Sequence, residues 1–389
     1  MPSIKSVLLP LFTGFAIFSM FFGAGNIVFP LLVGATGGEN SLWEILGFLV
    51  TGVVIPFLGV MAVLFFKGDH NVFLGRVGKR TSFLITTCLM ILIGPFAVIP
   101  RCVTLSHATF RAIAPESSLF NFALVSALLI LVLSYRKGIV LDILGKILTP
   151  VLLGGLIWLV VKGLFFSSQQ VEHPPLSGIP SLPNFWSGLV TGYQTMDLIA
   201  SFYFSSFVYY SLKLKVGEGK NIIGQALSSS FVGAGFLAFV YISLSYLAHL
   251  NAVRLEGVKP EELLGQLSLL VLGREAGYLA NVVAALAALT TAISLMSVFV
   301  SFVHTDVFKG RVNEKIILVV STLIAFIFSN LNFGGIMAFL GPIVEVLYPA
   351  MIVLTFCNIL YYFFGFKPIR GPFYLALILS LIHKLATLL

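Results

Sequence analysis

The stretch FFGAGNIVFP, residues 21–30, decides the fold. It lies in an apolar segment that runs without a charged residue from Ser6 to Gly38, and a run of this length predicts a helix that crosses a membrane. Its middle, GAGN at residues 23–26, contains two glycines and an asparagine, which favour helix ends and turns over helix interiors. The segment therefore predicts a membrane helix that is weakened at its centre.

The composition is that of an integral membrane protein. The chain has 389 residues, of which 58% are hydrophobic and only 10% are charged, whereas about 25% charged residues is usual in soluble domains. The apolar runs are too long for barrel strands, which cross in about ten alternating residues. Eleven segments are predicted to span the membrane as helices, and they centre on residues 7–35, 43–66, 82–110, 119–135, 139–161, 185–211, 221–249, 277–306, 316–331, 335–362 and 372–388.

The basic residues predict the orientation of these spans. When the N-terminus is placed in the cytoplasm, lysines and arginines concentrate in alternate loops, as the positive-inside rule requires. The net charge of +8 is explained by these loops, so nucleic acid is not an expected partner. The alternation favours eleven spans with 335–362 as one long helix despite Pro342 and Pro349, and a break there would make twelve.

The arrangement of the spans predicts two halves. Residues 1–165 would form a first repeat of five helices and 185–362 a second one, with 166–184 as an external connector and 363–389 as an additional helix. Because five is odd, two such repeats must lie in the membrane with opposite orientation. Inverted repeats of this kind are typical of secondary transporters.

The weak centre of the first span predicts a binding site for a zwitterion. Unpaired backbone groups in hydrocarbon cost several kcal/mol each, so a broken helix persists where protein, water or a ligand satisfies them. A helix that restarts near Ala24 to Asn26 would direct N–H groups and a positive dipole end at an anion. Carbonyls around Ser19 to Phe22 would suit a cation or an ammonium group. A free amino acid carries both charges, although close helix packing is an alternative role for Gly23 and Gly25.

A second interruption favours the binding site over simple packing. The sequence TGYQTMD, residues 191–197, interrupts the first span of the second half at the corresponding depth. Paired interruptions at corresponding positions are a sequence signal for the binding site of a transporter.

These two motifs carry a family resemblance. FFGAGNIVFP together with GYQTMDLIAS at 192–201 resembles the bacterial LIV-II branched-chain amino acid carriers, the branched-chain amino acid:cation symporter family of the amino acid–polyamine–organocation superfamily. The resemblance implies an all-α membrane protein with a leucine-transporter-like 5+5 inverted repeat, broken first and sixth helices, and one or two extra C-terminal helices. The sequence departs from the family in one respect, because it shows one span fewer than the usual twelve.

The resemblance also implies an activity. The carrier would import leucine, isoleucine and valine across the bacterial cytoplasmic (inner) membrane by sodium symport with alternating access, with Na⁺ as coupling ion and no cofactor. The substrate carboxylate would lie against the N–H groups of Ala24 and Gly25, and its ammonium near carbonyls of Phe21 and of Tyr193 or Gln194. Phe18, Phe22, Phe204 and Met296 are chosen for the apolar side-chain pocket by residue type and depth. The predicted substrate-binding set is Phe18, Phe21, Phe22, Gly23, Ala24, Gly25, Tyr193, Gln194, Thr195, Phe204 and Met296.

Hydroxyl groups on the eighth span predict a cation site. Thr290, Ser294, Ser297 and Ser301 recur every three or four residues and so share one helix face. Sodium is a hard cation that prefers several oxygen ligands. Polar contacts between helices are the alternative role, which we favour for Ser297 and Ser301. The predicted sodium set is Ser19, Phe22, Asn26, Thr290, Thr291 and Ser294.

Two acidic residues lie at membrane depth, where they tend to be functional. Asp197, beside the second interruption, can bind a cation, carry a coupling proton or cap the restarted helix. Glu345 is expected to pair with a basic group, for which Arg101 is one candidate.

Several readings compete with sodium symport of branched-chain amino acids. The nearest alternative is a transporter that is coupled to protons or accepts a broader range of apolar amino acids. A channel is a more distant alternative. An enzyme is not expected, because no H-E-x-x-H or G-x-S-x-G motif is present. Transport driven directly by ATP is not expected either, because the sequence has no P-loop motif. The sequence leaves open the order of preference among substrates, the ion stoichiometry and the oligomeric state.

Overall fold

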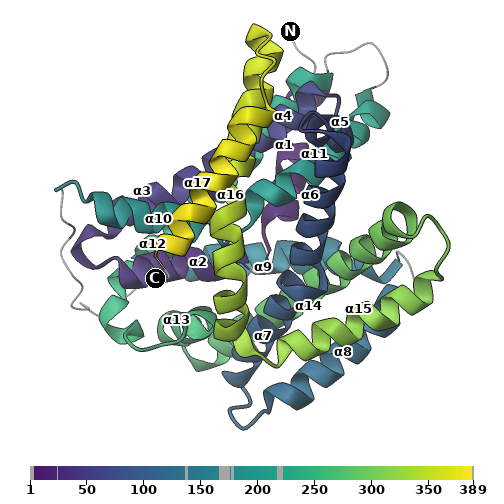
Figure 1. The fold of residues 1–389 in the computed structure, drawn as a ribbon. Coiled ribbons are helices and arrows are strands. Elements are labelled where there is room, and N and C mark those ends of the chain that lie inside the picture. Colours follow the sequence, from purple (N-terminus) through teal and green to yellow (C-terminus); the bar gives the residue numbers. More distant parts are fainter. Residues whose placement is uncertain are drawn as a thin grey trace. The chain divides into compact units, whose positions relative to one another are not determined.

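The computed structural model describes residues 4–23, 25–135, 139–165, 176, 179–216 and 222–387. This part of the chain is mostly helical and contains no β-strand. Each of the eleven predicted segments coincides with one helix or with consecutive helices (Figure 1). The prediction of an all-α protein is confirmed.

Several helices are long and apolar enough to cross a membrane. Among the described residues, five continuous helical segments meet this requirement, and the bent pair Leu9–Phe21 and Gly25–Thr36 makes a sixth candidate span. Two shorter apolar helices cover Leu119–Tyr135 and Leu153–Phe165. The five continuous segments are Gly38–Phe65, Lys79–Arg111, Ile222–Leu250, Arg274–Val307 and Asn332–Phe364.

The helices divide into two compact units. Unit 1 consists of Met1–Thr86, Pro175–Ser245 and Gly341–Leu389, and unit 2 of Thr87–Pro174 and Tyr246–Leu340. Each unit thus takes segments from both predicted repeats. The repeat boundaries themselves, 1–165 and 185–362, stay a prediction.

Unit 1 contains the N-terminal helices and the C-terminal pair, together with the first residues of α6 and most of α12 and α16. Its helices are α1 (Ile4–Phe21), α2 (Gly25–Thr36), η1 (Gly38–Asn40), α3 (Ser41–Leu49), η2 (Val50–Val54), α4 (Ile55–Phe65), α5 (His70–Gly75), α10 (Leu182–Tyr193), α11 (Asp197–Val216), α12 (Ile222–Leu250), α16 (Asn332–Phe364) and α17 (Arg370–Ala386). As predicted, α16 runs as one helix through Pro342 and Pro349.

Unit 2 is built around α14, which packs against α7, α8, α9, α13 and α15. Its helices are the rest of α6 (Lys79–Ile91), η3 (Leu92–Phe96), α7 (Val98–Arg111), α8 (Leu119–Tyr135), α9 (Ile139–Phe165), η4 (Ala252–Leu255), η5 (Pro260–Glu262), α13 (Leu263–Leu272), α14 (Arg274–Phe302), η6 (Val303–Val307) and α15 (Glu314–Ser329).

The helix α13 lies in segment 251–276, which is outside the eleven predicted spans. Its leucines Leu263, Leu264 and Leu267 are buried. The Asn281 amide of α14 donates to the Ser268 hydroxyl of α13 at 3.0 Å. With only ten residues α13 is too short to span a bilayer, yet it is a packed part of unit 2.

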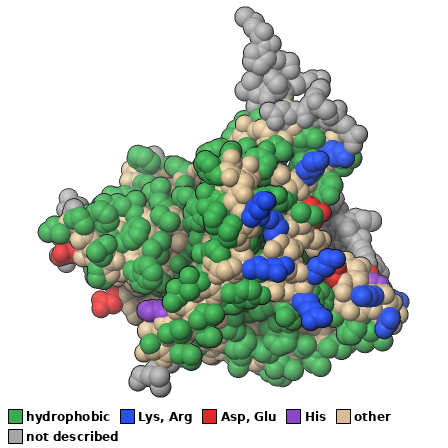
Figure 2. Space-filling view, turned by 45° about the horizontal axis from the view of Figure 1, so that its top comes forward, with side chains coloured by type: hydrophobic (Ala, Val, Ile, Leu, Met, Phe, Trp, Pro, Cys, Tyr) green, Lys and Arg blue, Asp and Glu red, His purple; other side chains and the backbone are tan. Residues whose placement is uncertain are grey.

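The described surface is largely apolar. Leu84, Phe239 and Leu375 are each more than half exposed, and hydrophobic side chains cover most of the described face in Figure 2. A soluble monomer rarely exposes apolar patches of more than a few hundred Å². Such a surface fits a chain that is surrounded by lipid.

Small residues bring α3 and α10 of unit 1 into close contact. Gly188 and Gly192 form a G-x-x-x-G pattern on α10. A Cβ placed on Gly188 would lie 2.0 Å from the Glu44 carbonyl oxygen, and one on Gly192 would lie 2.0 Å from the Thr51 hydroxyl. The same hydroxyl donates to the Leu189 carbonyl at 2.8 Å. This contact sets the position of the helix that leads into the second interruption.

We predict that Gly188→Ala destabilises the protein by about 1–3 kcal/mol, because the new methyl group forces two backbones apart. The measurement is thermal unfolding of the purified protein in detergent. Gly235→Ala on α12 is the matched control, because a Cβ there meets no atom within 4 Å. Equal melting temperatures for the two variants would contradict the assigned contact.

Candidate functional site

The first helix break lies between α1, which ends at Phe21, and α2, which begins at Gly25. The two helices are bent by 76°. The Phe22 amide still donates to a carbonyl one turn earlier, at 2.8 Å, and Gly23 follows outside the helix. The predicted break in the first span is confirmed. Ala24, part of the predicted carboxylate site, lies outside the described residues.

Asn26 closes this break from the first turn of α2. Its side-chain Oδ1 accepts a hydrogen bond from the Gly23 amide at 3.3 Å. Its backbone amide donates to the Gly23 carbonyl at 3.1 Å. Both backbone polar groups of Gly23 therefore have partners, as a break at membrane depth requires.

The second break separates α10, which ends at Tyr193, from α11, which begins at Asp197. Thr195 bonds on both sides of it: its hydroxyl donates to the Gly192 carbonyl at 2.9 Å and accepts from the Asp197 amide at 3.4 Å. Met196 has a positive φ of 62°, a backbone conformation that costs a residue with a side chain about 1–3 kcal/mol. The predicted break in the sixth span is also confirmed, and its backbone is strained.

A buried hydrogen-bond network joins the two breaks. The Asn26 Nδ2 donates to Asp197 Oδ2 at 2.8 Å, and the Tyr241 hydroxyl of α12 donates to the same oxygen at 2.9 Å. Asn26 and Tyr241 also contact each other through a short hydrogen bond. All three side chains are at most 3% exposed. The start of α2 and the start of α11 are thus linked through one carboxylate.

A second tyrosine supports the restarted helix α11. The Tyr348 hydroxyl of α16 accepts a hydrogen bond from the Leu198 amide at 3.0 Å. Its ring stacks on Tyr193, with 4.7 Å between ring centroids. Tyr348 therefore touches both ends of the second break.

The aromatic residues predicted to line an apolar pocket are brought together in pairs. Phe18 and Phe22 stack with their ring centroids 5.1 Å apart, and Phe21 meets the edge of Phe204 at 5.2 Å. Phe18, Phe21 and Phe22 are buried. Met296 is buried within unit 2, on α14. The described structure thus brings three of the predicted pocket residues, Phe18, Phe22 and Phe204, beside the first break together with Phe21.

The hydroxyls of the predicted sodium site lie on α14 in unit 2. Thr290 and Thr291 both donate to the Ala287 carbonyl, at 2.8 and 3.0 Å, and Ser294 donates to the Thr290 carbonyl at 3.0 Å. A hydroxyl that donates its hydrogen in this way still has oxygen lone pairs that can coordinate a cation. Within the described residues, no group of three or more His, Cys, Asp or Glu side chains could hold a metal ion.

Comparison with known families shows what kind of protein this is. Residues 7–388 match the family model described as branched-chain amino acid transport protein. The chain belongs to this family. The resemblance noted in the two motifs is confirmed over nearly the whole chain, and both the family and the fold are those of membrane transporters.

Relatives of this carrier occur in staphylococci. A protein of Staphylococcus saprophyticus named as a branched-chain amino acid carrier is 31% identical over 390 residues, which cover 95% of this chain and 87% of the relative. A Staphylococcus aureus protein named in the same way is 29% identical over 393 residues, with 96% and 88% covered.

Solved structures support the fold of the carrier. The inward-facing conformation of Mhp1 aligns with a TM-score of 0.66 at 13% identity, covering 96% of this chain and 89% of Mhp1. A manganese transporter of Eremococcus coleocola aligns with a TM-score of 0.59 at 14% identity, covering 100% and 88%. The leucine-transporter-like fold is therefore confirmed for the carrier.

Three features of the carrier were not found by sequence reasoning. Tyr241 and Tyr348 were not selected as site residues. The available signal was that a tyrosine hydroxyl inside an apolar helix needs a hydrogen-bond partner. Glu345 forms an ion pair with Lys384 of α17 at 2.6 Å, a partner that the sequence reasoning did not suggest. In Figure 1, α17 lies alongside α16, which explains this pairing.

We predict that Tyr241→Phe lowers the stability of the carrier by about 1–3 kcal/mol, because Asp197 and Asn26 lose a shared buried partner. Thermal unfolding in detergent measures the loss. Tyr210→Phe is the control, because Tyr210 lies on α11 with its side chain 54% exposed. A Tyr241→Phe protein that melts together with the control would show that the network contributes little.

Proposed function

We propose that this carrier imports leucine, isoleucine and valine across the bacterial cytoplasmic membrane by sodium symport with alternating access and a cytoplasmic N-terminus. The observation that carries the proposal is the pair of helix breaks joined through Asn26, Asp197 and Tyr241. Family membership supports an amino acid as substrate. The helix termini at the breaks support a ligand that has one positive and one negative group.

The backbone of the first break would hold the charged end of the amino acid. The start of α2 at Gly25 offers N–H groups and a positive dipole end to the carboxylate. Carbonyls at the end of α1, around Phe21, and at the end of α10, at Tyr193 and Gln194, would accept from the ammonium. Gly25 is buried, so both interactions would form away from water and be correspondingly strong.

The side chain of the substrate would occupy the aromatic cluster beside the break. Phe18, Phe22 and Phe204 of unit 1 form its walls in this proposal, and Met296, which lies in unit 2, stays a pocket residue that the sequence predicts. A wholly apolar pocket distinguishes one methylene by only about 1–3 kcal/mol. Acceptance of all three branched-chain amino acids is the expected consequence.

Asp197 favours sodium over proton coupling. Two side-chain donors, from Asn26 and Tyr241, point at the same carboxylate oxygen. This oxygen is therefore held in a structural network, and the hydroxyls predicted to bind sodium would make a second coupling ion unnecessary. In unit 1 sodium would bind at Ser19, Phe22 and Asn26. The hydroxyls of Thr290, Thr291 and Ser294 in unit 2 stay ligands that the sequence predicts.

The direct test is uptake of labelled leucine into proteoliposomes that contain the purified carrier. A sodium gradient should drive accumulation above the external concentration, and a pH gradient without sodium should not. Competition by unlabelled isoleucine and valine, but not by lysine, should reduce the uptake. Accumulation driven by the pH gradient alone would overturn sodium coupling and leave the amino-acid assignment intact.

We predict that Asp197→Asn retains part of the sodium-driven uptake, because an amide oxygen can still accept hydrogen bonds at the start of α11. The same proteoliposome assay measures it. Asp306→Asn, at an exposed position of η6, should behave like the parent. Proton-driven accumulation by the parent that is lost in Asp197→Asn, with substrate exchange preserved, would assign proton transfer to Asp197.

We also predict that Thr290→Ala and Thr291→Ala each raise the sodium concentration needed for half-maximal uptake by about tenfold, which corresponds to ~1.4 kcal/mol. Weaker sodium binding should also lower the affinity for leucine, because the two sites are thermodynamically linked. Ser297→Ala is the matched control, because Ser297 also donates to a carbonyl of α14, at 3.0 Å, but lies outside the proposed site. Unchanged sodium curves in both threonine variants would place the sodium site elsewhere.

A further inference from the structure

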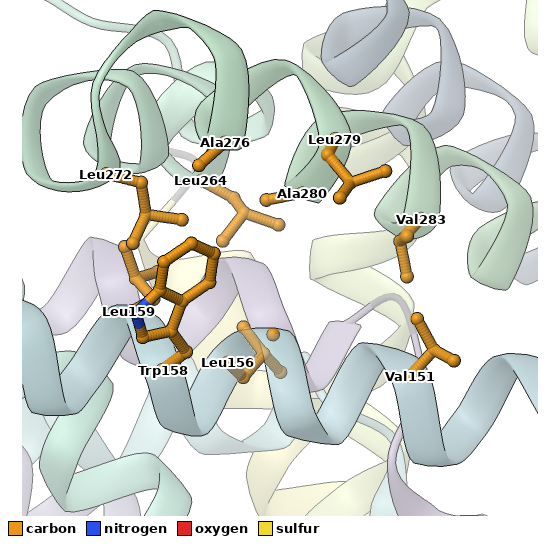
Figure 3. Close-up of a pocket in the computed structure, with 11 residues that line it drawn as sticks. Val151, Leu156, Trp158, Leu159, Leu264, Leu272, Ala276, Leu279, Ala280 and Val283 are labelled. Atoms are coloured by element: carbon orange, nitrogen blue, oxygen red, sulfur yellow. The ribbon is translucent and has the colours of Figure 1, made fainter.

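Unit 2 contains an apolar groove whose lining includes none of the proposed substrate or sodium residues. One wall is α9 and the other is formed by α13 and the start of α14. Figure 3 shows the side chains of α9 pointing toward those of the other two helices. The groove is lined by Val151, Gly155, Leu156, Trp158, Leu159, Leu264, Leu272, Ala276, Leu279, Ala280 and Val283.

The groove is open and carries no charge on its walls. Trp158 is 49% exposed and Leu279 is 63% exposed at its rim, whereas Leu159 is buried at its base. A Cβ placed on Gly155 would meet no atom within 4 Å. The missing side chain at position 155 therefore leaves room for an occupant that is itself apolar, such as a hydrocarbon chain.

Basic groups lie at one end of this groove. Lys162, one turn beyond Trp158 on α9, donates to the carbonyl of the lining residue Leu272 at 2.9 Å. An ammonium has three N–H donors, so this group can serve a second acceptor as well. Arg274, two residues after Leu272, is exposed and donates from Nε to the Tyr278 hydroxyl at 3.1 Å, which leaves its other guanidinium N–H groups for a further acceptor.

We propose that the groove binds an anionic phospholipid, with one acyl chain along Gly155 and Leu159 and the phosphate at Lys162 and Arg274. The apolar walls match the chain, and the basic end matches the headgroup. Glu275 is an exposed acidic neighbour of Arg274, so Lys162 provides most of the preference for negative charge. This lipid site is independent of the proposed transport cycle, because it uses none of the substrate or sodium residues.

Trp158 reports occupancy of the groove directly. The chain has three tryptophans, so Trp43→Phe and Trp186→Phe leave Trp158 as the single fluorophore. This protein is reconstituted into phosphatidylcholine vesicles that contain a small fraction of phosphatidylglycerol. Bromine atoms, which quench tryptophan fluorescence on contact, are placed on the acyl chains of either lipid at equal mole fraction.

Brominated phosphatidylglycerol should be enriched at Trp158 about fivefold over brominated phosphatidylcholine, the factor that corresponds to ~1 kcal/mol for one basic side chain at an anionic lipid. Lys162→Gln should remove most of this preference. Gly155→Leu should reduce quenching by phosphatidylglycerol, because the new side chain occupies the space of the acyl chain.

Gly154→Leu is the matched control for the groove. Position 154 also offers open space to a side chain, but it does not line the groove, since adjacent residues lie about 100° apart around a helix. Quenching should be unchanged in Gly154→Leu. Equal quenching by the two lipids in the parent, or equal effects of the two leucine variants, would overturn the proposal. Weak quenching by both lipids in the parent would also overturn it, because no acyl chain would then contact Trp158.

Discussion

The hydrogen bonds of Asn26 to Asp197 and to Gly23 are the constraint on which the rest of the site depends. A membrane helix that stops and restarts exposes backbone N–H and C=O groups where water is scarce, and each unpaired group costs several kcal/mol. Asn26 satisfies Gly23 locally and reaches across to the start of the second restarted helix. One side chain therefore stabilises the first break and fixes its position relative to the second.

The unbroken helices of unit 1 follow from the same constraint. Since α2 and α11 begin inside the protein, their first turns need partners from outside their own sequences. Tyr241 on α12 and Tyr348 on α16 provide them, one to the Asp197 carboxylate and the other to the Leu198 amide. Long continuous helices can supply such partners, because their own backbone groups are already hydrogen-bonded and only a side chain has to reach the restarted helix.

Much of this fold could be predicted from local sequence, and the exceptions have a common cause. The apolar segments and both helix breaks are determined by short stretches of sequence, because the length of a hydrophobic run and its glycine content affect the helix only within a few turns. Tyr241, Tyr348 and the pairing of Glu345 with Lys384 depend on which helices become neighbours. In the same way α13 was not predicted, because ten residues are too few for a span and do not reveal whether they will be buried against α14.

Under the proposed function, this network also explains how ion and substrate binding can be coupled. A sodium ion beside Asn26 would sit next to a side chain that already holds Asp197 and the Gly23 backbone. Any change in the position of Asn26 would then alter the N–H groups at the start of α2, where the carboxylate of the amino acid would bind. Linkage requires the effect to be reciprocal, so the substrate must favour sodium binding as much as sodium favours the substrate. The strained backbone at Met196 lies between α10 and α11, directly before Asp197 of this network. Relief of part of that strain in another conformation would offset the cost of rearranging the network during the transport cycle.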